Sequence, residues 1–136
     1  MIHLLFMVTL VIAGAIDAAT NKIHNLFPLL IAALAIARLV CDPSALPSRV
    51  IGCFLLSVPM LLLALGKGGL GGGDIKLTAA CGLFMGADAL LRGTLIAGLL
   101  ALIVHLFLQH TKKAGSQDVF AFGPYLAIGF IFSSLL

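Results

Sequence analysis

Six near-continuous apolar stretches account for most of this chain. They consist almost entirely of Leu, Ile, Val, Ala and Phe, and they cover residues 1–16, 26–40, 50–65, 75–85, 89–108 and 119–136. Because they are longer than barrel strands and show no polar–apolar alternation, we expect helices. A membrane-spanning helix takes about 20 residues. The pattern therefore predicts an all-α integral membrane protein, a six-span polytopic helical bundle that forms a single membrane-embedded domain over residues 1–136.

The scarcity of charge excludes a soluble fold. Apolar residues make up 62% of the chain and charged residues 10%, whereas a soluble domain has about 25% charged residues. The net charge of +3 comes from scattered Lys and Arg, so we expect a lipid bilayer and no nucleic acid as partner. The three cysteines form no Cys-x-x-Cys and the histidines are dispersed. We therefore expect no disulfide framework, no metal and no cofactor.

The basic residues predict an orientation. In membrane proteins the cytoplasmic loops carry the excess of Lys and Arg. The connections after the first, third and fifth stretches carry five lysines, and the opposite side carries three arginines. The positive-inside rule thus places the odd-numbered connections in the cytoplasm and both termini outside. The residues are Lys22, Lys67, Lys76, Lys112 and Lys113 on one side and Arg38, Arg49 and Arg92 on the other.

Two stretches depart from a simple spanning helix. Residues 75–85 would cover only about 17 Å at about 1.5 Å per residue, which predicts a half-helix or a part of a longer broken helix. Pro59 lies inside the third stretch and should kink it.

A glycine cluster precedes the fourth stretch. Six glycines fall within residues 66–73, directly before Asp74. So many glycines disfavour a helix and predict a loop that can adopt positive φ and let another backbone approach closely. The alternative is a flexible linker with Asp74 as a helix N-cap. A phosphate-binding loop is a poor match, because the Gly-Lys-Ser/Thr ending is missing.

Two aspartates are expected at the same membrane face. Asp17 follows sixteen residues without a formal charge, and an acid at such depth is usually functional or paired, unless it marks a helix end at the interface. Two neighbouring carboxyls share a proton, because both cannot ionise cheaply. One of them can then deprotonate a water while the other protonates a scissile carbonyl, which is aspartic-protease chemistry. Helix dipoles and Lys76 predict that Asp74 is ionised and that Asp17 holds the proton.

The residues around both aspartates resemble the type IV prepilin peptidase family of G-x-G-D aspartyl proteases. Gly71-Gly72-Gly73-Asp74 fits the G-x-G-D motif, and the next six residues resemble its continuation x-K-L-x-A-A. Asp17 followed by Ile23-His24-Asn25 resembles the first aspartate and the downstream Ile-Pro-Asn, with His24 in place of proline. Residues 122–127 resemble the F-G-P-x-L-A of the last span. The chain lacks the cysteine-bearing insert of the larger two-activity enzymes and is similar to the short stand-alone peptidases of Tad/Flp-type pilus systems, and secondarily to archaeal preflagellin peptidases.

The resemblance implies an endopeptidase of the inner or plasma membrane that removes the leader of type IV pilin-like precursors, after a glycine, at the cytoplasmic face. It implies that Asp17 and Asp74 are the catalytic pair and that Gly71 and Gly73 let the substrate approach. Lys76 would place a positive charge beside Asp74, unless it is only a snorkelling anchor. The other motif residues that the resemblance marks as supporting the site are Asn25, Gly123 and Pro124.

Two other functional classes stay open at this point. Glycine-broken helices and membrane-embedded carboxylates also build ion pathways, so a small proton- or cation-coupled transporter or channel subunit is the main alternative. The other is an assembly subunit without activity, in which both aspartates could be replaced without loss of function.

Overall fold

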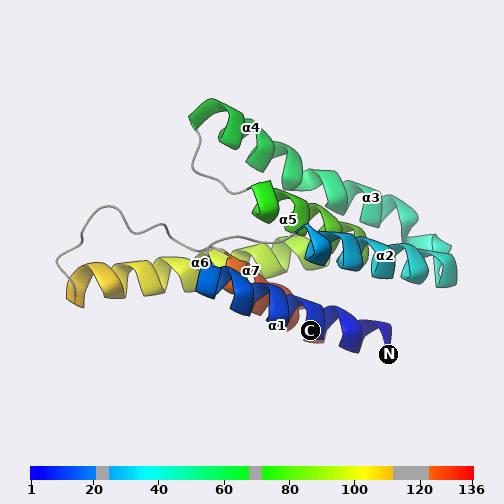
Figure 1. Ribbon diagram of the computed structural model, residues 1–136. Coiled ribbons are helices and arrows are strands. Elements are labelled where there is room, and N and C mark those ends of the chain that lie inside the picture. The colour runs from blue at the N-terminus through cyan, green and yellow to red at the C-terminus, as the bar shows by residue number, and fades with distance from the viewer. Residues whose placement is uncertain (21–24, 68–71, 112–122) are drawn as a thin grey trace.

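The computed structural model describes residues 1–20, 25–67, 72–111 and 123–136, and this part of the chain is a bundle of helices without strands (Figure 1). Almost all described residues of the predicted stretches are helical, which confirms an all-α membrane protein. The elements are α1 (Ile2–Thr20), α2 (Leu26–Cys41), the 3-10 helix η1 (Pro43–Ala45), α3 (Leu46–Leu55), α4 (Ser57–Lys67), α5 (Gly72–Met85), α6 (Ala87–Thr111) and α7 (Gly123–Leu135).

The third stretch is broken at Leu56, as the sequence predicts. Pro59 becomes the third residue of α4, where its missing N–H costs little. In a continuous helix its ring would press on the carbonyl of Leu55, four residues earlier. The chain therefore ends α3 at Leu55 and restarts at Ser57.

The outer surface is suited to lipid. Among the described residues, three segments are long and apolar enough to cross a membrane, namely Ile2–Thr20, Pro43–Gly66 and Ala87–His110, and α2 and α7 are shorter apolar helices. Large apolar side chains such as Leu29, Leu62 and Leu95 are more than half exposed. A soluble protein would bury such side chains, whereas a bilayer solvates them.

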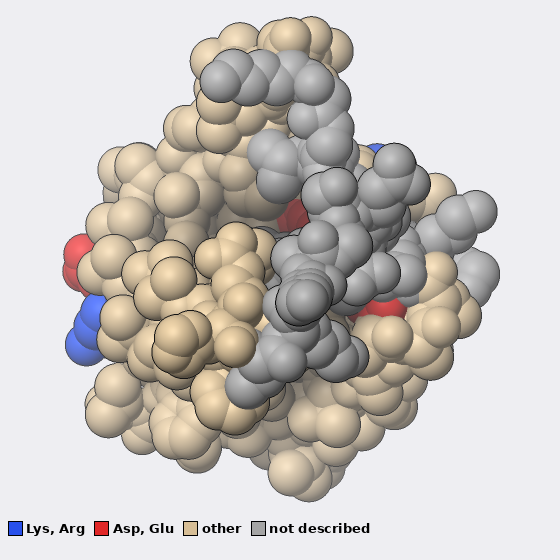
Figure 2. All heavy atoms as spheres, turned by 90° about the vertical axis from the view of Figure 1, so that its left-hand side faces the viewer, with Lys and Arg blue, Asp and Glu red and all other residues tan. Residues whose placement is uncertain are grey.

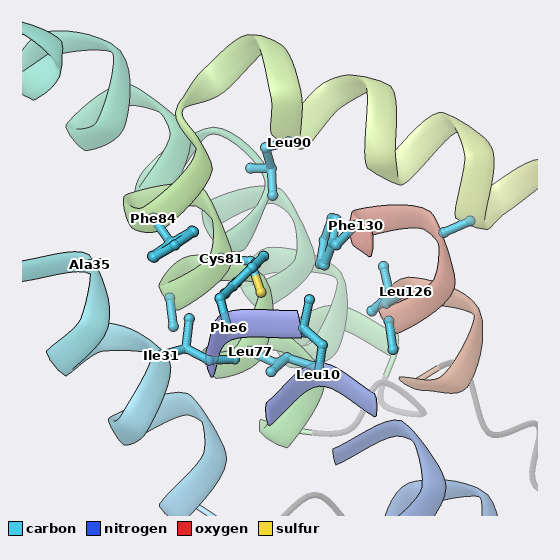
Figure 3. Packing of buried hydrophobic residues seen from close by; sticks show 13 residues of the cluster. Phe6, Leu10, Ile31, Ala35, Leu77, Cys81, Phe84, Leu90, Leu126 and Phe130 are labelled. Carbon is cyan, nitrogen blue, oxygen red and sulfur yellow. The ribbon is translucent and has the colours of Figure 1, made fainter. Parts of the chain in front are cut away.

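The core is organised around α5, which contacts α2, α3, α4, α6 and α7. Its apolar residues Leu77, Cys81 and Phe84 are fully or almost fully buried (Figure 3). The ring of Phe84 stacks on that of Phe6 from α1, with centroids 4.1 Å apart. The helix begins at Gly72, three residues earlier than the predicted stretch.

Glycines allow two close helix crossings. A side chain at Gly82 of α5 would overlap the backbone of Gly52 in α3, and one at Gly129 of α7 would overlap that of Gly93 in α6. Small residues let membrane helices pack backbone against backbone. Gly86 has a different role, because its φ of +89° makes the tight turn between α5 and α6.

The two ends of the bundle differ in chemistry. One end gathers the C-terminal turn of α1 and the first turns of α5 and α7 (Figure 1). The opposite end brings His3, Arg38, Arg92 and Leu136 around one cavity, so both chain ends lie there. The predicted separation of an arginine-bearing end from the end with the aspartates is therefore present in the fold.

Candidate active site

Asp17 is held between the end of α1 and the start of α7. Its side chain is only 5% exposed, and its Oδ2 accepts a hydrogen bond from the backbone amide of Gly123 at 3.0 Å. A Cβ at Gly123 would overlap this Oδ2 and lie 2.7 Å from Cγ. Glycine at position 123 is therefore required by the space that the carboxylate occupies.

The same two helices approach closely one turn away. A Cβ at Gly14 would lie 3.0 Å from the Cβ of Ala127 and 3.5 Å from the Cα of Pro124. Pro124 is the second residue of α7, where a missing N–H is tolerated. Gly14, which the sequence analysis did not single out, thus lets α1 carry Asp17 up to the amide of Gly123.

Asp74 is the third residue of α5, and its Oδ1 is buried without a hydrogen-bond partner among the described residues. Burial, and to a smaller extent the nearby charge of Asp17, together raise the pKa of Asp74 from 3.8 to about 6. The two carboxyls therefore interact, as a proton-sharing pair requires. Figure 2 views this end of the bundle, and most of the surface that it shows is uncharged, with few acidic atoms visible.

The sequence prediction that the helix dipole and Lys76 lower the pKa of Asp74 has the wrong direction. It relied on the positive end of the α5 dipole and on Lys76. In the structure the Nζ of Lys76 donates to Oδ1 of Asn25 at 3.1 Å, on the exposed side. Desolvation of the Asp74 carboxyl thus prevails over the helix dipole.

Lys76 and Asn25 tie the first turn of α5 to the residue that precedes α2. They are 51 positions apart in the sequence, and both belong to motifs that the sequence analysis singled out. Their contact lies at the same end of the bundle as the aspartates, because Lys76 follows Asp74 by two residues.

The glycine cluster differs from the prediction. Gly66 lies in the last turn of α4, and Gly72 and Gly73 are the first two residues of α5. None of these three glycines is therefore a loop residue. Gly73 therefore does not supply a positive φ, and Asp74 is not an N-cap. The first turn tolerates glycine because the packing of α5 fixes the helix. Gly71 lies outside the described residues.

One further residue near Asp74 was missed. The hydroxyl of Thr78, which is 1% exposed, donates to the backbone carbonyl of Asp74 at 2.8 Å. This contact uses the local i to i−4 spacing that Thr adopts in helices, and nothing in the sequence pattern distinguishes it from other threonines. Among the described residues no group of three or more His, Cys, Asp and Glu side chains is placed to hold a metal ion.

Comparison with known proteins gives consistent matches. Residues 4–106 match the type IV leader peptidase family. The prepilin leader peptidase/N-methyltransferase of Pectobacterium carotovorum subsp. carotovorum is 42% identical over 73 residues, which is 54% of this chain and 26% of that protein. The protein of the same name from Dickeya chrysanthemi is 43% identical over 63 residues, 46% of this chain and 22% of that protein. The chain thus spans about a quarter of the length of these relatives. No solved structure matches the chain significantly.

Proposed function

The chain belongs to the type IV leader peptidase family, and on that basis we propose that it is an aspartyl endopeptidase that removes the leader peptide of type IV pilin-like precursors. The observation that carries the aspartyl assignment is the electrostatic pairing of Asp17 and Asp74 at one end of the bundle. Two coupled carboxyls are sufficient for peptide hydrolysis, because they can move the protons that the reaction needs. The proposal concerns the peptidase activity alone.

The two carboxyls are assigned different roles. Oδ2 of Asp17 accepts a hydrogen bond from the backbone N–H of Gly123, so this oxygen carries no proton. Asp74, with a pKa raised to about 6, is the better holder of the shared proton. In this scheme Asp74 protonates the scissile carbonyl while Asp17 takes a proton from the attacking water. When the tetrahedral intermediate collapses and the C–N bond breaks, Asp17 passes the water proton to the leaving nitrogen, and a hydroxyl of the intermediate returns a proton to Asp74.

The surroundings restrict how a substrate can reach the pair. Asp17 is almost fully buried and Asp74 is partly buried, so a helical substrate segment could not present its carbonyl to them. An extended peptide has free carbonyls and a smaller cross-section. We propose that the leader is extended at the cleaved bond, and that the precursor's apolar segment stays in the lipid beside the bundle.

The proposed orientation places the aspartates at the cytoplasmic face of the inner or plasma membrane and both termini outside. Cys41 provides a native probe of this arrangement, because it is exposed and adjoins Asp42 at the arginine-bearing end. A membrane-impermeant thiol reagent should label Cys41 in intact cells and should not label Cys41→Ser. Labelling that requires cell disruption would reverse the orientation.

The decisive experiment is cleavage of a pilin-like precursor by the purified chain in detergent. We expect leader removal, and a loss of about 10²- to 10⁴-fold in both Asp17→Asn and Asp74→Asn, because an amide cannot exchange the protons. Asp88→Asn, which changes an exposed acid in the first turn of α6, is the matched control and should cleave normally. Undiminished cleavage in either site variant would contradict the proposal. Ion flux through reconstituted protein without cleavage would favour the transporter alternative instead.

A further inference from the structure

A polar cavity lies at the end of the bundle opposite to the two aspartates. Its volume is about 190 Å³, and it is enclosed by the beginning of α1, the ends of α2, α5 and α7, and the first turns of α6. Two arginines, Arg38 and Arg92, and the imidazole of His3 line it beside Phe84 and Leu136. No acidic side chain belongs to the lining. The cavity is therefore polar and cationic within a largely apolar bundle.

The guanidinium of Arg38 is fixed in place. Its Nη1 donates to the backbone carbonyl of Phe84 at 3.3 Å, and its Cζ lies 4.9 Å from the centroid of the Phe84 ring. His3 packs edge-on against the same ring at 5.5 Å. A guanidinium has five N–H donors, and the described hydrogen bond uses one of them. The others are available to a ligand without rearrangement of the side chain.

The positive charge at this end is not balanced by ion pairs. Arg49 is only 3% exposed and lies near Arg38 and His3, and its Nη1 has no hydrogen-bond partner among the residues that the structure describes. Within the described residues no carboxylate forms an ion pair with any of the three arginines. Asp42 acts on Arg38 and Arg49 only through space, because it is fully exposed and accepts the Ser44 hydroxyl at 2.5 Å. Placing several guanidinium groups close together costs free energy, because like charges repel and are partly desolvated, unless an anion binds between them.

The two serines of the lining do not compete with the arginines as donors. The hydroxyl of Ser133 donates to the Ala89 carbonyl at 2.6 Å, and that of Ser134 donates to the Ile131 carbonyl at 2.8 Å. An anion in the cavity would therefore be held by Arg38 and Arg92, with His3 beside them.

We propose that this cavity binds the phosphate group of a membrane phospholipid between the guanidiniums of Arg38 and Arg92. The planar guanidinium fork matches the oxygens of a phosphate. The cavity lies at the end of a membrane bundle, at the level where lipid headgroups lie. Apolar residues at this end, including Met1 and Leu136, are more than four-fifths exposed and can contact the acyl chains. The cavity volume accommodates a phosphate with its glycerol attachment, while the chains stay outside.

The test is lipid binding by native mass spectrometry of the full chain in a non-ionic detergent. We expect retention of one phosphatidylglycerol molecule and no retention of diacylglycerol with the same acyl chains, since the phosphate is the recognised group. Arg92→Gln is the primary variant, because Arg92 is exposed and forms no hydrogen bond or ion pair with another described residue. It should weaken phosphatidylglycerol binding about fivefold. Lys67→Gln, which removes one positive charge from the last residue of α4, is the matched control and should not weaken it.

The remaining outcomes each decide the proposal. Arg92→Lys should bind phosphatidylglycerol with intermediate affinity. Lysine keeps the positive charge but lacks the planar guanidinium that can donate two parallel hydrogen bonds to a phosphate. Equal retention of diacylglycerol, or full affinity in Arg92→Gln, would overturn the phosphate assignment. Displacement of phosphatidylglycerol by inorganic phosphate at similar concentration would overturn the lipid assignment and identify a site for free anions. None of these results depends on the proteolytic activity.

Discussion

Replacement of Asp74 by Asn should stabilise the fold above pH 6 while it abolishes the proposed activity. The carboxyl is partly buried, its Oδ1 has no described hydrogen-bond partner, and burial and Asp17 raise its pKa to about 6. The folded chain therefore binds this proton more tightly than the unfolded chain, in which the pKa is near 3.8. The stabilisation by this proton is complete below about pH 4 and is lost as the pH rises through about 6.

The size of the effect follows from the shift. The difference between 3.8 and about 6 corresponds to about 3 kcal/mol, at about 1.4 kcal/mol per pKa unit. Because Asp74 is partly exposed, solvent screening reduces this to about 1–2 kcal/mol. Asn has the same shape as Asp and no charge to desolvate. At pH 8 the free energy of unfolding of the variant should therefore exceed that of the wild type by this amount. At pH 4.5 the folded carboxyl is protonated but the unfolded one is still mostly ionised, so about a third of the gain should remain.

Thermal unfolding at two pH values measures this difference. The helical circular dichroism signal of the detergent-solubilised proteins would be followed during heating at pH 4.5 and pH 8. We expect a higher Tm for Asp74→Asn at pH 8, by about 2–6 °C, and a difference about one third as large at pH 4.5. Asp88→Asn makes the same chemical change at an exposed position of α6, so its free energy of unfolding should change by less than about 0.5 kcal/mol.

Two results would refute this reasoning. An Asp74→Asn variant that is less stable at pH 8 would show that the carboxylate makes favourable contacts. A gain of equal size at both pH values would show that the effect is steric and not electrostatic. Loss of cleavage without any gain in stability would be consistent with a catalytic role for Asp74. It would contradict the claim that burial of the ionised carboxylate destabilises the fold.

Three further predictions concern the surroundings of the pair. Gly123→Ala should lower cleavage at least about 100-fold, because its Cβ would displace the Asp17 carboxylate, whereas Gly98→Ala, with open space around it, should cleave normally. Asn25→Ala and Lys76→Ala should each lower cleavage less than about tenfold, since their contact is exposed; a double variant much weaker than either single one would contradict the shared contact. In a pH profile, wild-type cleavage should fall as the pH rises well above about 6, when the pair loses its proton; a rise over that range would argue against Asp74 as the acid.

The helical architecture could be predicted from the sequence because it depends on local composition. A run of apolar residues long enough to approach the bilayer thickness has no other stable solution in lipid than a helix. The break near Pro59 was equally predictable, since it arises from one missing N–H and one ring. The start of α5 was not predictable in this way. Glycine disfavours a helix locally, and only the packing of α5 against five other helices makes Gly72 and Gly73 helical.

The members of the site could be predicted, but their geometry could not. The family resemblance points to Asp17, Asp74 and Gly123 residue by residue, yet the hydrogen bond between the first and the last joins positions 106 apart. The electrostatic error has the same origin. Lys76 is close to Asp74 in the sequence, but its ammonium group is directed toward Asn25, from another helix. Which neighbour a charge contacts is decided by tertiary packing.

The length of α5 connects the fold to the chemistry. Its 14 residues span about 21 Å, which is less than the hydrocarbon thickness of about 30 Å. Its C-terminal end is tied to the arginine-bearing end by the contact of Arg38 with the Phe84 carbonyl. The start of α5 therefore lies less than a bilayer thickness from the arginine-bearing end, and there burial and the charge of Asp17 raise the pKa of Asp74. A full-length helix would carry the same carboxyl into bulk water, where its pKa would return toward the ordinary value of 3.8 and the proposed sharing of a proton with Asp17 would be weaker.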